Sequence, residues 1–189
     1  MNADPDRRSR YRTAEPLRLG YMIDTLVTGG AERLVVTFAE ALRGRSDVAL
    51  TVFVLHDGDT PFRRQLEALE IDIIRLPGKN LVDRRRFLRL LTALRGRRIE
   101  YLHAHLASST TLGAFAAGLL GIPFATTLHN VRPSVRRVRR VRKLLHRVAL
   151  RLPGTEKIAV GQAVAEASRS ELGRSGCRVV PNAVPASVV

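Results

Sequence analysis

Residues 17–42 read LRLGYMIDTLVTGGAERLVVTFAEAL, and this stretch decides the fold class. Its beginning, residues 17–23, is apolar and predicts a buried strand. A helix is expected at 31–43, because apolar residues recur there at steps of three and four. Gly29 and Gly30 lie between the two segments. A strand, a glycine turn and an amphipathic helix in this order indicate the start of a parallel α/β sheet.

The same alternation continues along the rest of the chain. Further strands are predicted at 50–55, 72–76, 101–105, 124–128, 157–160 and 178–180. Helices are predicted from Pro61, behind the N-cap Thr60, and at 82–95, 110–120, 134–150 and 163–172. Seven strands alternating with six helices indicate a doubly wound α/β domain, with helices on both faces of a mostly parallel sheet.

Length and composition fit one such domain. The chain has 189 residues, of which 45% are hydrophobic and 26% charged, and a single domain usually takes about 100–200 residues. We expect residues 1–16 to be a disordered basic tail and residues 17–184 to form the domain. Cys177 is the one cysteine, which excludes an intrachain disulfide and a zinc site made of cysteines. The N-terminus lacks the apolar segment of a secretory signal, so we expect a cytoplasmic location.

Positive charge is concentrated in one stretch. The 32 Lys and Arg residues outnumber the 17 Asp and Glu residues, and residues 132–151 hold nine cations and no acid. A helix at 134–150 with this pattern indicates either a solvated basic face or contact with acidic lipid on the inner face of the plasma membrane. Nucleic acid is a weaker candidate partner, because aromatic residues make up only 5% of the chain. The expected membrane or anion contacts are Arg136, Arg137, Arg139, Arg140, Arg142 and Lys143.

Polar residues follow several of the predicted strands, where ligands of parallel sheets bind. Gly29 and Gly30 open a helix and favour an anion, although a simple tight turn is the better explanation of an isolated glycine pair. The spacing matches neither a dinucleotide-binding motif nor a P-loop. His103 and His105 share one face of a strand, where a buried, hydrogen-bonded His103 is favoured over a metal pair because no third ligand has natural spacing.

Five stretches in this order also resemble one family of enzymes. They are residues 17–42 around GGAER, YLHAH at 101–105, TLHN at 127–130, IAV at 158–160 and VPNAV at 180–184. Together they are similar to the N-terminal, acceptor-side domain of family-4 glycosyltransferases, which have the GT-B fold. The resemblance covers nearly the whole chain.

The resemblance implies a function. It implies transfer of a sugar from a nucleotide sugar to a sugar or lipid-linked acceptor, with retention at the anomeric carbon and without a metal or other cofactor. His129 would face the reacting sugar as the catalytic residue, and a neutral imidazole there positions a hydroxyl more than it transfers a proton. The substrate-binding residues would be Gly29, Gly30, Glu32, Arg33, His105, Ser108, Asn130 and Asn182.

The donor-binding half of such enzymes has no counterpart in residues 1–189. We expect it to be absent, with residues 185–189 lying where it would begin, so that the chain alone is inactive and works with a separate donor-binding chain. Without that half, the leaving diphosphate lacks a source of electrostatic stabilisation. The alternative is a non-catalytic binding module, or a truncated gene product, that associates with an anionic membrane or a partner chain.

Overall fold

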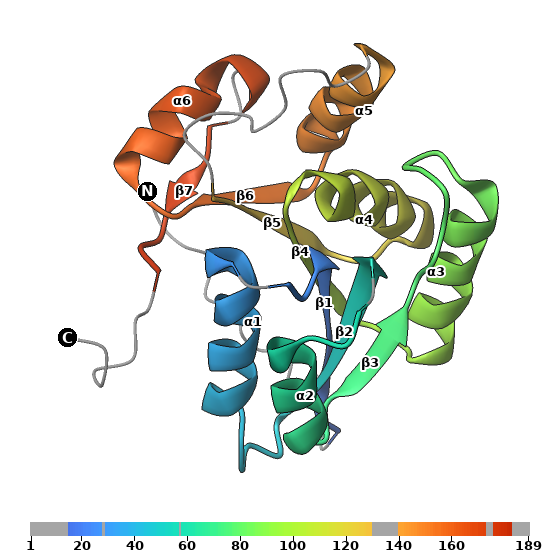
Figure 1. The fold of residues 1–189 in the computed structure, drawn as a ribbon. Helices are drawn as coiled ribbons and strands as arrows, with labels where there is room; N and C mark the ends of the chain where they lie inside the picture. The colour runs from blue at the N-terminus through green and yellow to red at the C-terminus, as the bar shows by residue number, and fades with distance from the viewer. Residues whose placement is uncertain (1–14, 28, 57, 130–139, 173–175, 183–189) are drawn as a thin grey trace.

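The computed structural model describes residues 15–27, 29–56, 58–129, 140–172 and 176–182 (Figure 1). Seven strands form one sheet in the order β3-β2-β1-β4-β5-β6-β7, and every neighbouring pair is parallel. The strands are β1 (Leu17–Thr25), β2 (Val48–His56), β3 (Asp72–Arg75), β4 (Tyr101–His105), β5 (Phe124–Leu128), β6 (Thr155–Ala159) and β7 (Arg178–Val179). The predicted doubly wound α/β sheet is therefore confirmed.

Helices cover both faces of the sheet (Figure 1). They are α1 (Gly30–Ala41), α2 (Pro61–Ala68), α3 (Arg84–Gly96), α4 (Ala107–Leu120), α5 (Arg140–Arg151) and α6 (Gln162–Leu172). Buried residues of α1 and α2 share one core cluster, and buried residues of α3, α4 and α5 share the other. Both clusters include side chains of the central strands, so these strands are buried on both sides as their continuous apolar runs predict.

The centre of the sheet contains the point where the chain changes direction. From β1 the chain moves outward through β2 to β3, and α3 then returns it to β4 on the other side of β1. Gly20 lies in this centre, and a Cβ atom there would come within 2.9 Å of Leu102 and 3.1 Å of Phe53. Ligands of open α/β sheets bind beyond the carboxyl ends of the strands at such a switch point, which here lies between β1 and β4.

Most predicted boundaries agree with the structure within a few residues. Thr60 caps α2 as expected, with its hydroxyl accepting a hydrogen bond from Arg63 N at 3.3 Å. The fourth helix begins earlier than the predicted residue 110, because α4 starts at Ala107 and includes Ser108 and Ser109 in its first turn. Predicted residues 134–139 of the basic helix and 1–14 of the tail lie outside the described residues. No helix in the described part of the chain has the length and apolar character needed to cross a membrane.

Candidate functional site

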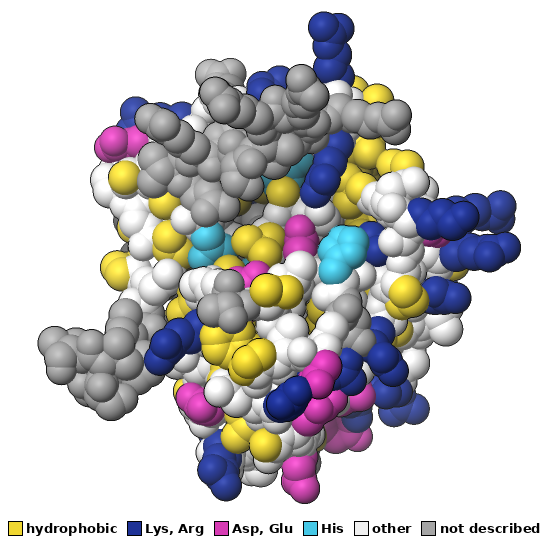
Figure 2. All heavy atoms as spheres, in the orientation of Figure 1, with side chains coloured by type: hydrophobic (Ala, Val, Ile, Leu, Met, Phe, Trp, Pro, Cys, Tyr) yellow, Lys and Arg dark blue, Asp and Glu magenta, His cyan; other side chains and the backbone are white. Residues whose placement is uncertain are grey.

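The carboxyl ends of β1, β4 and β5 place a group of polar side chains at the switch point. The face seen in Figure 2 has histidine and acidic side chains near its centre, with Lys and Arg side chains projecting farther out. The residues at these strand ends are Asp24 and Thr25 on β1, His105 on β4 and His129 directly after β5. Their positions agree with the edge at which the sequence predicts a site.

Asp24 joins β1 to the first turn of α4. Its Oδ1 accepts hydrogen bonds from the Ser109 backbone N–H and hydroxyl, both at 2.6 Å, and its Oδ2 accepts from Ser108 N at 3.3 Å. A carboxylate at a helix N-terminus satisfies amides that have no partner within the helix and interacts favourably with the helix dipole. The residue before the helix, Leu106, has φ 69° and ψ 162°, a conformation that is strained for any residue other than glycine.

Four aromatic rings from β1, β4 and the residue after β5 lie against one another, which we call the histidine cluster: Tyr21, His103, His105 and His129. The rings of Tyr21 and His105 lie nearly parallel, with centroids 4.4 Å apart. His105 Nδ1 lies 2.7 Å from His129 Nε2, and His103 Nε2 lies 2.8 Å from Thr127 Oγ1. The predicted hydrogen-bonded His103 is thus confirmed, and among the described residues no three potential metal-ligating side chains form a metal-binding group.

Burial keeps the histidine cluster uncharged at neutral pH. Desolvation lowers the pKa of His103 to about 4, with a smaller contribution from His129, and lowers the pKa of His129 to about 4. It also lowers the pKa of His105 well below its usual range, assisted by the two neighbouring imidazoles. A neutral imidazole has one N–H donor and one acceptor nitrogen, so His129 can donate or accept a hydrogen bond but holds no positive charge for a ligand.

The hydrogen bonds of His105 indicate which nitrogen of His129 carries its proton. His105 Nε2 is buried without a partner among the described residues, so a proton there would be an unsatisfied buried donor. Such orphaned N–H groups are rare, which favours a proton on His105 Nδ1, donated to His129 Nε2. His129 then carries its own proton on Nδ1. This tautomer is assigned from the hydrogen bonds, and it gives His129 an N–H donor on the side away from His105.

The glycine turn after β1 holds a carboxylate of the protein itself. Gly29 is the N-cap of α1 in an extended conformation, and Gly30 is the first residue of the helix. The carboxylate of Glu32 lies so close to Gly29 that a Cβ atom there would clash with it. Glu32 Oε1 also accepts a hydrogen bond from Thr25 Oγ1 at 3.0 Å. Glu32 therefore occupies part of the space in which the sequence predicts a bound anion.

Helix α5 contacts the start of α4 beside this site. Arg142 Nη2 donates to Ser108 Oγ at 2.6 Å, and His146 Nδ1 lies 3.1 Å from Thr111 Oγ1. Arg140, Arg142 and Lys143 are all exposed, and Arg142 also donates to Ser108, so their contact with a membrane or an anion stays a prediction. Arg136, Arg137 and Arg139 lie outside the described residues.

The predicted substrate-binding residues do not all come together. His105 is only 3% exposed and lies behind His129, so it reaches a ligand only through that residue. Ser108 is 5% exposed and is held between Asp24 and Arg142. Arg33 is exposed on α1, and Asn182 follows the edge strand β7, three strands away from β4. Asn130 lies outside the described residues.

A family comparison decides the affiliation of the chain. Residues 28–188 match the family model described as Glycosyltransferase Family 4. The chain belongs to glycosyltransferase family 4. No curated protein matches its sequence. The resemblance predicted from short motifs is thereby confirmed for the family, and the chain is a glycosyltransferase-like domain of GT-B type.

Solved structures share the fold of this family-4 domain. HepE from Anabaena, in complex with UDP-glucose, has a TM-score of 0.71 and 19% identity, over 88% of this chain and 44% of that chain. MurG from Acinetobacter baumannii has a TM-score of 0.55 and 14% identity, over 88% and 46% of the two chains. UDP-N-acetylglucosamine 2-epimerase from Rickettsia bellii has a TM-score of 0.59 and 10% identity, over 88% and 45%. The family-4 domain thus spans less than half the length of each of these proteins.

Two residues of the carboxyl edge were missed by the sequence analysis. Asp24 was not among the predicted site residues, because its partners on α4 are 84 and 85 residues away. Arg86 was not considered, although it shares a helix face with Leu90 and Leu94, which are also buried. A charged residue four and eight positions before two core leucines was the available signal.

Proposed function

We propose that this family-4 domain binds the acceptor in a retaining, metal-independent transfer of sugar from a nucleotide sugar. The observation that carries the proposal is His129: it lies at the switch point, is partly exposed, and is held by His105 at 2.7 Å. Retention and independence from metal rest on the resemblance to the family. The histidine cluster also supports an acceptor site at the carboxyl edge of the sheet, because residues with perturbed pKa values are concentrated at functional sites.

The role of His129 in the proposal is to orient a hydroxyl. With a pKa of about 4, His129 is neutral at physiological pH and is a weak general base. Its Nδ1–H can donate to the oxygen of a sugar hydroxyl and hold it in the geometry for attack. Positioning of this kind lowers the activation barrier of the transfer, because the hydroxyl is already oriented before it reacts.

Glu32 complements His129 in the proposed acceptor site. Its carboxylate lies beside the glycine turn and accepts from Thr25 at 3.0 Å, which leaves further lone pairs for sugar hydroxyls. Gly29 keeps this place free of a side chain. A donor on His129 and an acceptor on Glu32 suit a neutral polyhydroxyl ligand better than an anion at this part of the edge.

A screen of small sugars tests the proposed acceptor site. We would record saturation-transfer NMR spectra of the protein with mono- and disaccharides, and repeat the positive cases with His129→Ala. The variant should keep its circular dichroism spectrum and lose sugar affinity by about 0.5–1.5 kcal/mol, the net value of one hydrogen bond. Arg95→Gln, an exposed change on α3, is the control and should bind as the wild type does. Equal sugar binding by His129→Ala and the control would refute the site.

The donor side of the reaction is proposed to lie outside residues 1–189. The match of less than half the length of HepE supports a second, donor-binding unit, on this or another polypeptide. Residues 1–189 alone should bind UDP or GDP weakly and transfer no sugar. Calorimetry that gave micromolar affinity for either nucleotide would contradict the proposal that a separate unit binds the donor.

A second element of the proposal is contact of α5 with an anionic membrane. Helix α5 carries an exposed apolar stripe: Val141 and Leu144 are 62% and 61% exposed, and Val148 is 41% exposed. The stripe is flanked by the exposed cations Arg140 and Lys143. An exposed apolar stripe beside cations is the pattern of helices that lie in the headgroup region of a bilayer.

Vesicle binding tests this contact. The protein should sediment with phosphatidylglycerol vesicles but not with phosphatidylcholine vesicles, and binding should weaken as added salt shortens the Debye length from about 10 Å at 0.1 M to about 3 Å at 1 M. Leu144→Ser combined with Lys143→Glu should abolish binding. Leu119→Ser, an equally exposed change on α4 (65%), should not. Loss of binding in both variants alike, or in neither, would remove α5 from the proposal.

A further inference from the structure

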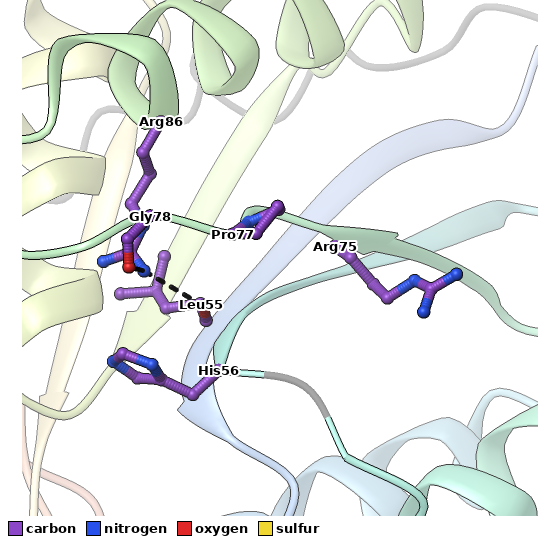
Figure 3. Close-up of a pocket in the computed structure, with 6 residues that line it drawn as sticks. All are labelled: Leu55, His56, Arg75, Pro77, Gly78 and Arg86. Carbon is purple, nitrogen blue, oxygen red and sulfur yellow. Dashed lines mark hydrogen bonds between the residues drawn. The ribbon is translucent and has the colours of Figure 1, made fainter.

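A second polar site lies on the other side of β1, at the carboxyl ends of β2 and β3. A cavity of about 400 Å³ is lined there by six residues, which we call the arginine pocket (Figure 3): Leu55, His56, Arg75, Pro77, Gly78 and Arg86. Leu55 and His56 end β2, Arg75 ends β3, and Arg86 comes from the first turn of α3. Figure 3 shows the guanidinium of Arg86 and the imidazole of His56 on the same side of the pocket.

Arg86 is the buried charge of this pocket. The residue is only 1% exposed, and within the described part of the chain its guanidinium hydrogen-bonds to three backbone carbonyls and no carboxylate: Gly78 O at 2.7 Å, Leu55 O at 3.2 Å and Asn80 O at 3.3 Å. Its Nε is buried with no partner among the described residues. A guanidinium has five N–H donors, so three carbonyls leave part of its hydrogen-bonding capacity unused.

Two carboxylates, those of Asp83 and Asp24, favour the charged form of Arg86, but both are hydrogen-bonded to backbone amides. Asp83 caps α3 by accepting from Arg85 N at 2.9 Å and Arg86 N at 3.2 Å, and it also accepts from Lys79 N at 2.9 Å. Asp24 caps α4 through the amides of the 108–109 turn. Burial accordingly lowers the pKa of Arg86, while Asp83 and Asp24 oppose this only from a distance. A buried cation without a paired anion is costly, and a bound anion relieves that cost.

We infer that the arginine pocket binds a phosphate group of a small ligand, with Arg86 as its charged anchor and His56 as a second donor. The guanidinium fork matches the oxygens of a phosphate. Phosphate presents acceptors in several directions, whereas a carboxylate presents them in one plane, and the donors here come from α3 and from the end of β2. The cavity of about 400 Å³ also leaves room for the group that carries the phosphate.

The pocket adjoins the proposed acceptor site. His56 pairs with Thr25 in the β1–β2 register, and Thr25 in turn donates to Glu32. A ligand with its phosphate at Arg86 therefore extends along the carboxyl edge toward Glu32 and His129. That the ligand is a phosphorylated acceptor rests on the proposed function, whereas phosphate binding itself does not.

Titration with inorganic phosphate tests the pocket, with acetate as the carboxylate counterpart. We would follow backbone amide shifts of the protein by NMR in a buffer without other oxyanions. Phosphate should shift the backbone amides of Leu55, His56 and Gly78 saturably, and acetate should bind about tenfold more weakly. Acetate binding as tight as phosphate, or shifts spread over the whole basic surface without saturation, would overturn the assignment.

Variants separate the pocket from the general positive charge of the chain. Arg86→Gln should weaken phosphate at least about tenfold, and His56→Asn about threefold. Arg95→Gln removes the same charge from the exposed end of α3 and should stay within about twofold of the wild type. If Arg86→Gln does not fold, the surface variant His56→Asn with Arg75→Gln decides: an unchanged phosphate affinity refutes the pocket, and a loss beyond that of Arg95→Gln supports it.

The two proposals fail in different ways. Saturable phosphate binding together with unchanged sugar binding by His129→Ala would leave the pocket standing and refute the acceptor site. Sugar binding that depends on His129, without saturable phosphate binding, would support the acceptor site and refute the arginine pocket.

Discussion

The histidine cluster and the arginine pocket lie on the same edge of the sheet but satisfy their polar groups in opposite ways. In the cluster, His105 and His129 bond to each other, His103 bonds to Thr127, and burial keeps the rings neutral. In the pocket, Arg86 keeps its charge, and its hydrogen-bond partners among the described residues are backbone carbonyls. Groups that are partnered within the protein fix a geometry, whereas a buried charge without an opposite charge retains capacity for a ligand. The following predictions test this contrast.

Loss of the Asp24 carboxylate should lower the stability of the protein most, because Asp24 holds the start of α4 beside the histidine cluster. Asp24→Ala removes three hydrogen bonds to the start of α4. Bonds to a charged group contribute about 1.5–3 kcal/mol each and are not additive, so the free energy of unfolding should fall by about 4 kcal/mol. Urea denaturation measures this. Asp59→Ala, an exposed carboxylate paired with Arg64, should change stability little, and an equal loss in both variants would contradict the capping role.

Low pH should lower the stability of the folded protein, because unfolding allows the histidines of the cluster to be protonated. His103 and His129 have pKa values of about 4 in the folded protein, against 6.5 for a free histidine. Between these values the unfolded chain binds more protons, so stability is unaffected above pH 6.5 and falls as the pH drops from 6.5 to about 4. The fall should be at most about 3 kcal/mol for His103 and smaller for the more exposed His129.

Comparison with a variant isolates this contribution from carboxylates that titrate in the same range. Urea unfolding of His103→Asn should show a shallower loss of stability between about pH 6.5 and pH 4.5 than the wild type does. His56→Gln, at an exposed histidine, should keep the wild-type slope. The same slope in His103→Asn and the wild type would show that the cluster is charged or solvated.

The packing around Arg86 should give a smaller effect on stability and a specific effect on the pocket. A Cβ atom at Gly78 would lie 2.5 Å from Arg86 Nε and 2.9 Å from Arg86 Cβ. Gly78→Ala should therefore displace the guanidinium and destabilise the protein by about 2 kcal/mol, the usual scale of overpacking. Thermal unfolding and phosphate titration measure the two effects. Gly58→Ala, whose Cβ would meet nothing closer than 3.8 Å, is the control and should change neither.

Replacing His105 tests whether the paired groups act only by fixing geometry. His105→Phe keeps a ring against Tyr21 but cannot bond to His129. Stability should change little, while binding of any sugar that depends on His129 should weaken by about 1 kcal/mol. His105→Gln, which restores a donor, should recover part of that affinity in the NMR screen. Unchanged sugar binding by His105→Phe would show that His129 needs no orientation.

The fold could be predicted from the sequence because its signals are local. Apolar runs, the Thr60 cap and the helical spacing after Gly30 depend on residues a few positions apart. Short motifs in the same order indicated the family, and the family model confirmed it.

The site was predicted only in part because its contacts join distant residues. The hydrogen bond between His105 and His129, the cap that Asp24 gives to α4, and the carbonyl of Leu55 that holds Arg86 span 24, 85 and 31 residues. The start of α4 was missed for the same reason. Its N-cap residue Leu106 has no capping side chain, and the amides of its first turn are bound by the distant Asp24. Likewise, which face of α5 docks depends on α4, where Arg142 and His146 find their partners.

The return of the chain across β1 has a consequence for the order of folding. The strands β1 and β2 and the helix between them are close in sequence and can associate early, whereas β1 meets β4 only after a long loop has closed. The Asp24 contact to α4, 85 residues away, belongs to this late step. We therefore expect β1, β2 and β3 to pair before β4 and β5 add to the other edge of β1, so that the proposed acceptor site forms late in folding.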